Sequence, residues 1–150
     1  MKKAMIAIAM LVTFPAHAGV EEKKQRDAVD ATIAKAGDDL KDCGKKFKIV
    51  FDWKAYDAID WKKIGREKKE YYANEQNSVA EIGQGLNKLC ADKDYKAALT
   101  KVGTIIYKST NDESIRVRAT VKGNTMTLEN YTFGSTRHAD DYETAAKAAL

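Results

Sequence analysis

Residues 43–53, with the sequence CGKKFKIVFDW, decide how the middle of this chain folds. From Phe47 to Trp53, large apolar side chains alternate with polar or smaller ones, which is the period of a half-buried strand. Cys43 opens the stretch, and the only other cysteine of the sequence is Cys90. An even cysteine count in a chain with a secretion signal predicts a disulfide. We therefore expect a Cys43–Cys90 bond that closes the middle of the chain into one covalent loop.

The first eighteen residues have the pattern of a cleaved secretory signal peptide. Two lysines precede an apolar stretch of eleven residues (4–14), and a small-x-small motif ends at Ala18. Eleven residues are too few to cross a bilayer, which needs about 20. We expect cleavage before Gly19, a periplasmic or secreted protein, and no stable membrane anchor.

The predicted mature chain, residues 19–150, has the length of one domain. Loss of Lys2 and Lys3 leaves 24 of the 26 Lys and Arg residues against 22 Asp and Glu residues, a net charge of +2. Nucleic-acid binding is typical of a chain with Lys and Arg clustered on one face, which this balance does not indicate. Neither a nucleic acid nor a cofactor is expected.

Helical periodicity dominates the first two thirds of the chain. Apolar residues spaced three and four apart predict a helix over 20–42, with Gly44 as its stop, and a buried helical stripe over 79–90. Ser78 and Glu81 have the spacing of a capping box, so that either a second helix begins there or one long helix passes through. Two glycines inside the stripe, Gly83 and Gly85, predict close approach of a neighbouring element; a short helix over 95–100 follows, with Asp94 as its cap.

The last third changes to the period of strands. Residues 102–108 predict a strand, residues 114–122 alternate between apolar and polar side chains, and Gly123-Asn124 is a two-residue hairpin turn. Counting back from this turn pairs Val121 with Met126, Ala119 with Leu128 and Arg118 with Glu129. A short helix with Asp140 or Asp141 as its cap ends the chain. The predicted class is α+β: one small domain with an N-terminal helix, one strand, central helices, a three-stranded antiparallel meander and a C-terminal helix.

Candidate catalytic groups are few. Ser135, His138 and Asp140 or Asp141 are the residue types of a hydrolytic triad, but they share one polar segment without a strained nucleophile turn. Asp52, Asp57 and Asp60 could gather near a strand end as general acid–base pairs do in glycosidases, but they also have the spacing of turn and cap residues. One mature histidine and two paired cysteines are too few for a typical transition-metal site. No catalytic or metal-binding residue is assigned, and an enzyme is not the preferred interpretation.

Aromatic and basic residues interleave between positions 53 and 72. Tryptophan, tyrosine and arginine are enriched at binding hot spots because they bury rigid area and keep a polar end. The alternative is that the aromatics belong to the core and the lysines form a solvated helix face. Arg116 and Arg118 are a second candidate, although Arg118 opposite Glu129 is also a simple cross-strand pair. The candidate binding residues are Trp53, Tyr56, Trp61, Arg66, Tyr71 and Tyr72.

These observations favour a small soluble binding protein with a macromolecular partner in the cell envelope. An inhibitor or immunity-type partner of an envelope-acting enzyme or toxin fits the size, the cysteine pair and the lack of a strong catalytic motif. The first alternative is a binding module for an anionic small molecule or wall glycan. The second alternative is a hydrolase that uses His138.

Overall fold

Four strands form one mixed sheet in the computed structural model, which describes residues 16–150. The strands β1 (Lys48–Phe51), β2 (Thr104–Thr110), β3 (Val117–Lys122) and β4 (Thr125–Tyr131) lie in the order β1-β2-β4-β3. β1, β2 and β4 are parallel, and β3 runs antiparallel to β4. The α+β class is confirmed, and so is the place of the segment after Cys43 as a strand of the sheet.

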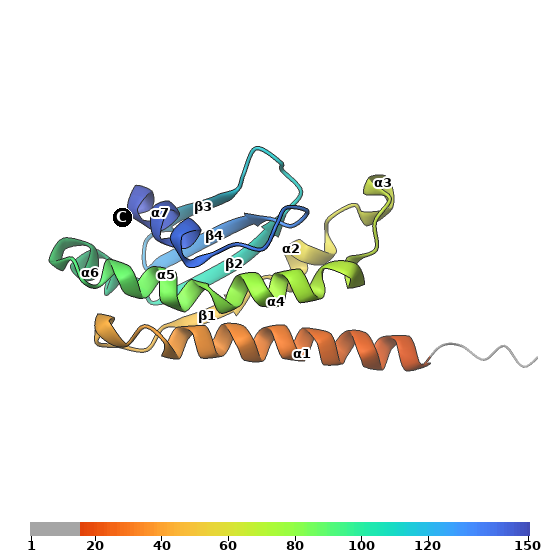
Figure 1. The fold of residues 1–150 in the computed structure, drawn as a ribbon, viewed down its shortest axis with the longest axis horizontal. Helices are drawn as coiled ribbons and strands as arrows, with labels where there is room; N and C mark the ends of the chain where they lie inside the picture. Colours follow the sequence, from red (N-terminus) through yellow and green to blue (C-terminus); the bar gives the residue numbers. More distant parts are fainter. Residues whose placement is uncertain (1–15) are drawn as a thin grey trace, which may run out of the picture.

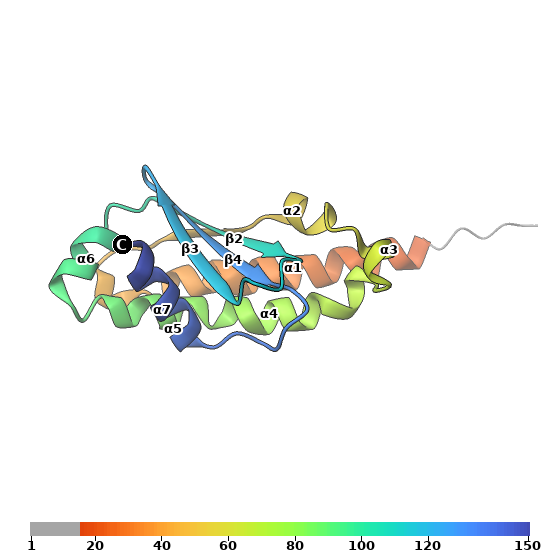
Figure 2. The same cartoon turned by 90° about the horizontal axis from the view of Figure 1, so that it is seen from above.

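Helices cover one face of this sheet. Figures 1 and 2 show α1, α4 and α5 running along that face, while α7 lies against the β3 side. The predicted signal peptide lies outside the described residues except for its last three, which belong to α1. The helices are α1 (Ala16–Asp38), α2 (Trp53–Asp57), α3 (Trp61–Ile64), α4 (Tyr72–Ala80), α5 (Ile82–Leu89), α6 (Lys93–Leu99) and α7 (Ala139–Ala149), with 3₁₀ turns η1 (Lys41–Cys43) and η2 (Lys68–Tyr71).

The core lies between the sheet and these helices. Alternate residues of β2 and β4, such as Ile105, Tyr107 and Leu128, are fully buried against α4 and α5, while the residues between them are half-buried on the other face. This two-residue alternation is what a sheet with one covered face requires. The predicted stripe over 79–90 is buried as well.

The prediction of a three-stranded antiparallel meander is wrong in the order of the strands. The predicted hairpin register is confirmed, because Val121 pairs with Met126, Ala119 with Leu128 and Arg118 with Glu129. However, β4 inserts between β3 and β2 and pairs with β2 in parallel. The reason lies in burial: the inner face of β4 is fully covered, while the small side chains of β3 stay half-exposed, which suits an edge strand.

Two predicted helix boundaries are also wrong, and one open alternative is decided. α1 ends at Asp38, and Gly44, with φ 75°, ends η1 instead. Of the two alternatives at Ser78, helix passes through this residue, which is buried within α4, and its hydroxyl accepts a hydrogen bond from the Arg137 N–H at 3.1 Å. The cap of α6 is Asp92, two residues before the predicted position. At these positions a tertiary contact or a nearby polar residue forms the backbone hydrogen bonds that the local pattern assigned to another residue.

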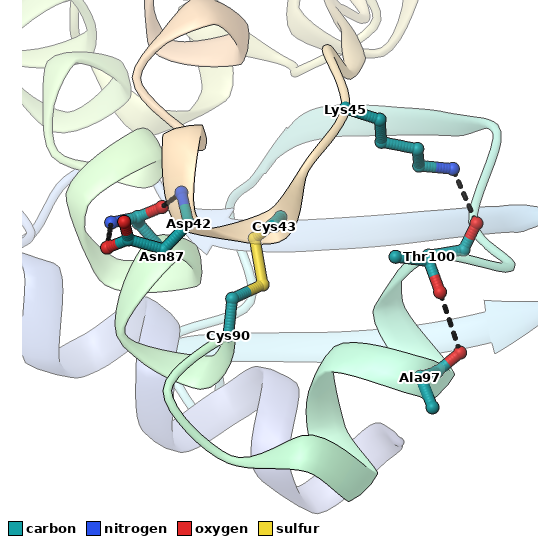
Figure 3. The surroundings of a disulfide bond; sticks show 7 residues. All are labelled: Asp42, Cys43, Lys45, Asn87, Cys90, Ala97 and Thr100. Carbon is teal, nitrogen blue, oxygen red and sulfur yellow. Dashed lines mark hydrogen bonds between the residues drawn. A yellow bond between two sulfur atoms is a disulfide. The ribbon is translucent and has the colours of Figure 1, made fainter.

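The Cys43–Cys90 disulfide is confirmed, and it joins the end of η1 to the end of α5 (Figure 3). The two Cα atoms are 5.0 Å apart, within the usual range for a disulfide. Beside it, the Asp42 N–H donates to Asn87 Oδ1 at 2.9 Å, and the Asn87 amide donates back to Asp42 Oδ2 at 2.7 Å. The disulfide and these hydrogen bonds therefore fasten the segment between α1 and β1 to the end of α5.

Close helix packing explains the two glycines of α5, as predicted. A Cβ at Gly83 would collide with the carbonyl oxygen of Ala36 in α1, and one at Gly85 would collide with that of Ala139 in α7. α5 is therefore held between two helices whose backbones leave no room for a methyl group.

Alanine at Gly83 or Gly85 is expected to lower the free energy of unfolding by about 1–3 kcal/mol, the usual cost of overpacking, because the obstacle is backbone. Urea unfolding of the oxidised protein measures this loss. The matched control is Gln84→Ala, at an exposed position of the same helix, which should change stability by less than about 0.5 kcal/mol. Equal stability of all three variants would show that α5 is not clamped.

Candidate functional site

A cleft of about 410 Å³ lies where the beginning of α1 meets α3 and η2. Its lining combines one tryptophan, three cations and three carboxylates. We call this cleft, together with the exposed side chains of α3, the Trp61 surface. The lining residues are Glu22, Asp57, Trp61, Arg66, Glu67, Lys68 and Lys69.

A single helical turn with a cap at each end positions Trp61. The Asp60 carboxylate accepts a hydrogen bond from the Lys63 N–H at 3.0 Å, which caps the beginning of α3. Gly65 ends the turn with φ 69°, a left-handed conformation that favours glycine. The Arg66 N–H then donates to the Trp61 carbonyl at 3.1 Å. These bonds fix the backbones of Trp61 and Arg66 beside each other at the cleft.

Aromatic rings support Trp61 from two sides. Its indole N–H donates to the Tyr56 carbonyl at 3.0 Å, and the two ring centroids are 4.9 Å apart. On the other side, Phe133, from the loop after β4, lies 5.4 Å from Trp61 and 4.9 Å from Tyr71. Trp61, Tyr71 and Phe133 are half-buried, so each ring is anchored and still reaches the surface.

One wall of the cleft is an ion-pair network. Arg26 binds Asp57 at 3.0 Å and Glu22 at 2.8 Å, and Lys68 binds Glu22 at 2.7 Å. Hydrogen bonding from Lys68 lowers the pKa of Glu22, and hydrogen bonding from Arg26 lowers the pKa of Asp57. Both carboxylates therefore stay ionised, and the two cations compensate their charge. The wall joins α1, α2 and η2 and adds no net negative charge to the cleft.

The segment 61–69 leaves an excess of positive charge. It contains five cations and one acid, Glu67, which gives a net charge of +4. Lys68 is held by the wall, and Lys69 pairs with Glu67 at 2.7 Å. Within residues 16–150, the exposed side chains of Lys62, Lys63 and Arg66 form no ion pair. The rest of the predicted mature chain carries −2, so the positive charge concentrates on this segment.

The structure distributes the predicted binding residues over three places. Trp61 and Arg66 line the cleft, with Tyr71 against the Trp61 ring. Tyr56 and Tyr72 belong to the core, where the Tyr56 ring contacts both Trp61 and Tyr72. Trp53 does not line the cleft: it stacks on Phe51, its ring lies 4.7 Å from the Arg26 guanidinium, and its indole N–H donates to Asp30 of α1 at 2.9 Å.

Sequence analysis missed two residues that contact the site but lie far from it in the chain, Arg26 and Phe133. Arg26 lies on a helix whose packing was unknown, so nothing local indicated its role in the wall. Phe133 had a weak signal, because it follows Tyr131, the last residue of β4, by two positions and so continues the alternation of the strand beyond its end.

The candidate catalytic residues have structural partners. Asp52 and Asp60 cap α2 and α3 as the turn-and-cap interpretation predicts, and Asp57 binds Arg26. His138 precedes α7, and its backbone N–H donates to Asp141 Oδ2 at 3.0 Å. The hydrolase alternative remains a prediction that these contacts do not support.

A buried polar cluster, which the sequence did not indicate, lies under the carboxyl ends of β2 and β4. Glu75 of α4 accepts hydrogen bonds from Tyr107 at 2.6 Å and from Ser109 at 3.0 Å. Asn130 donates to Tyr107 at 2.6 Å and accepts from Arg137 at 2.7 Å. Burial raises the pKa of Glu75 to about 7, against the opposing effect of these hydrogen bonds and of Arg137. We call these five residues the Glu75 cluster.

Comparison with protein-family models, with curated proteins and with solved structures gives no match. Over residues 16–150, no group of three or more His, Cys, Asp or Glu residues is placed to hold a metal ion. The helices of this described part include none long and apolar enough to cross a membrane. The inference about function therefore rests on the Trp61 surface itself.

Proposed function

We propose that this chain is a small periplasmic binding protein whose macromolecular partner presents acidic groups to the Trp61 surface. The observation that carries the proposal is a group of three exposed cations that form no ion pair within residues 16–150, next to half-buried aromatic rings. These cations are Lys62, Lys63 and Arg66. Opposite charges would attract an anionic partner to this surface, and the aromatic rings would anchor the partner once it is bound.

Rigidity of the surface supports a binding role. Asp60 and Gly65 hold the turn at both ends, and the Arg26 wall ties it to α1, so little order must be gained when a partner binds. The disulfide is typical of a protein in an oxidising compartment, in keeping with the predicted signal peptide. An inhibitor or immunity-type protein that blocks an envelope-acting enzyme or toxin has these properties.

Charge reversal at Lys62, Lys63 and Arg66, all to glutamate, is expected to abolish partner capture. The purified, oxidised mature chain is incubated with an envelope extract, mildly crosslinked, and the captured protein is identified. The matched control reverses Lys24, Lys35 and Lys41, which are equally exposed on α1 and η1 and change the net charge by the same amount. Capture that survives the first triple substitution, or that fails equally in both variants, would contradict the proposal.

The volume of the cleft favours a second candidate, the binding of an anionic small molecule or a wall glycan. About 410 Å³ is within the range of small-molecule sites, roughly 300–1,000 Å³, and Trp61 with Arg66 provides an apolar face beside a cation. Titration of the protein with soluble cell-wall fragments should then quench or shift the fluorescence of Trp61, and Trp61→Phe should lose the response. A flat titration would leave the macromolecular partner as the sole candidate.

A further inference from the structure

The outer edge of β3 presents backbone groups that no strand of the described sheet uses. β3 is the last strand in the sheet order, with β4 on its other side. In an antiparallel pair, alternate residues direct their N–H and C=O groups to the neighbour. The Tyr131 N–H donates to the Arg116 carbonyl. Because the pattern repeats at every second residue, the backbone groups of Arg118, Thr120 and Lys122 also point to β4. Val117, Ala119 and Val121 therefore direct their backbone groups outward.

A groove of about 300 Å³ accompanies this edge on the α7 side. Arg116 and Val117 form one wall, and α7 forms the other with Asp141, Thr144, Ala145 and Ala148. The residues with outward backbone groups also direct their side chains to this inner face, since side chains alternate along a strand. Val121 is 37% exposed there, a large apolar side chain that the described helices leave partly open. An added strand would direct every second side chain to this inner face, and the one beside Val117 would lie at the groove.

Positive charge accompanies the same edge. The strand and the residue before it carry Arg116, Arg118 and Lys122, all exposed. Arg116 lines the groove and pairs there with Asp141, and Arg118 pairs with Glu129, whereas Lys122 makes no ion pair within the described chain. The edge thus combines a hydrogen-bonding template, a small groove with alanines on its α7 wall, and three exposed cations of which Lys122 is unpaired in the described chain.

We propose that β3 binds an extended acidic segment of another polypeptide as a fifth strand. Main-chain hydrogen bonds to Val117, Ala119 and Val121 would supply affinity, as in other cases of strand addition. A small apolar side chain of the segment would enter the groove beside α7, and its acidic side chains would meet the exposed cations of the edge. This site is separate from the Trp61 surface and does not depend on it.

A second copy of the chain fits this edge poorly. Antiparallel self-pairing centred on Ala119 would place Arg116 directly opposite Lys122 in both halves of the pair. Like charges directly opposite each other destabilise a strand pair. Charged residues of this kind protect edge strands from pairing with themselves. An acidic segment turns the same charges into attraction, which is why the occupant is a different polypeptide.

Two synthetic hexapeptides test this inference, one alternating glutamate with valine and the other alternating lysine with valine. Amide hydrogen exchange of the oxidised mature protein is followed by NMR. At about ten times its Kd, the acidic peptide should slow exchange at Ala119 and Val121 about tenfold, and the basic peptide should leave both amides unchanged. Absence of slowing at millimolar peptide, or equal slowing by both peptides, would overturn the proposal. Slowing that depends on protein concentration alone would indicate self-association and would overturn it too.

Two substitutions locate the contact. Ala119→Pro removes an outward N–H without removing a hydrogen bond to β4, so peptide binding should be lost while the fold persists. Thr120→Pro removes a donor to β4 and should instead destabilise the hairpin. Lys122→Glu, at an exposed site, should weaken the acidic peptide and keep the fold, which preserves the test if the proline variant unfolds. The triple charge reversal of Lys62, Lys63 and Arg66 should leave the peptide's effect on exchange at β3 unchanged, which separates this site from the Trp61 surface.

Discussion

Replacing Glu75 with alanine is expected to lower the free energy of unfolding by about 2–4 kcal/mol, because each buried donor left without an acceptor costs about 1–3 kcal/mol. The side chain is fully buried, and both carboxylate oxygens accept hydrogen bonds. Its removal leaves the hydroxyls of Tyr107 and Ser109 without their acceptor. Urea unfolding measures the loss, with exposed Glu70→Ala as the control expected to stay within about 0.5 kcal/mol.

The pH dependence of stability gives a second measure of the same residue. Burial raises the pKa of Glu75 to about 7, above the ordinary value of 4.5 that the unfolded chain would show. A carboxyl shifted in this direction favours the folded state when protonated, so its contribution is complete below pH 4.5 and is lost as the pH rises through 7. The change is about 3 kcal/mol. In Glu75→Gln this part of the pH dependence should vanish. If the free energy of unfolding changed equally in the wild type and in Glu75→Gln between pH 5 and pH 8, the assignment would be contradicted.

Loss of the disulfide has the second large expected effect. Cys43 and Cys90 are 47 residues apart in the sequence, and closing a loop of this length stabilises the fold by about 4 kcal/mol in the chain-entropy model. The double substitution of both cysteines by serine should therefore lower the free energy of unfolding by about that amount. The measurement is urea unfolding of the oxidised wild type and the double variant, with reduced wild type as the control that keeps the cysteine side chains.

Loss of the disulfide should also loosen the structure locally. Without the bond, η1 and the end of α5 are held by hydrogen bonds such as those between Asp42 and Asn87. Amide exchange should accelerate most around these two segments. A loss below about 1 kcal/mol would mean that the unfolded chain keeps the two segments together without the bond.

Local patterns predicted the pieces of the fold better than their arrangement. The hairpin register followed from the two-residue turn at Gly123-Asn124, because side-chain period and loop length together leave one pairing. The parallel pairing of β2 with β4 had no local signal. It depends on which strand has its inner face fully covered by the helices, and no local pattern in β2 or β4 shows that.

The candidate site was predictable in part for a similar reason. Trp61 and Arg66 stood out by residue type and by the charge of their segment. Arg26 and Phe133 entered the site only through tertiary packing. Glu75 was hidden because, in a charged helix, a glutamate on the buried face has the same local pattern as one in solvent. Its role became visible when the strands placed Tyr107 and Ser109 beside it.

Site-specific photocrosslinking is the most direct test of the central claim, that a partner docks on the Trp61 surface. A photoreactive residue replaces exposed Lys63 in one sample and exposed Ala97 of α6 in another, and both oxidised proteins are irradiated in an envelope extract. The account predicts one discrete adduct at position 63 that disappears with Arg66→Glu, and none at position 97. The same adduct at both positions, or one at position 63 that is indifferent to the charge at position 66, would contradict it.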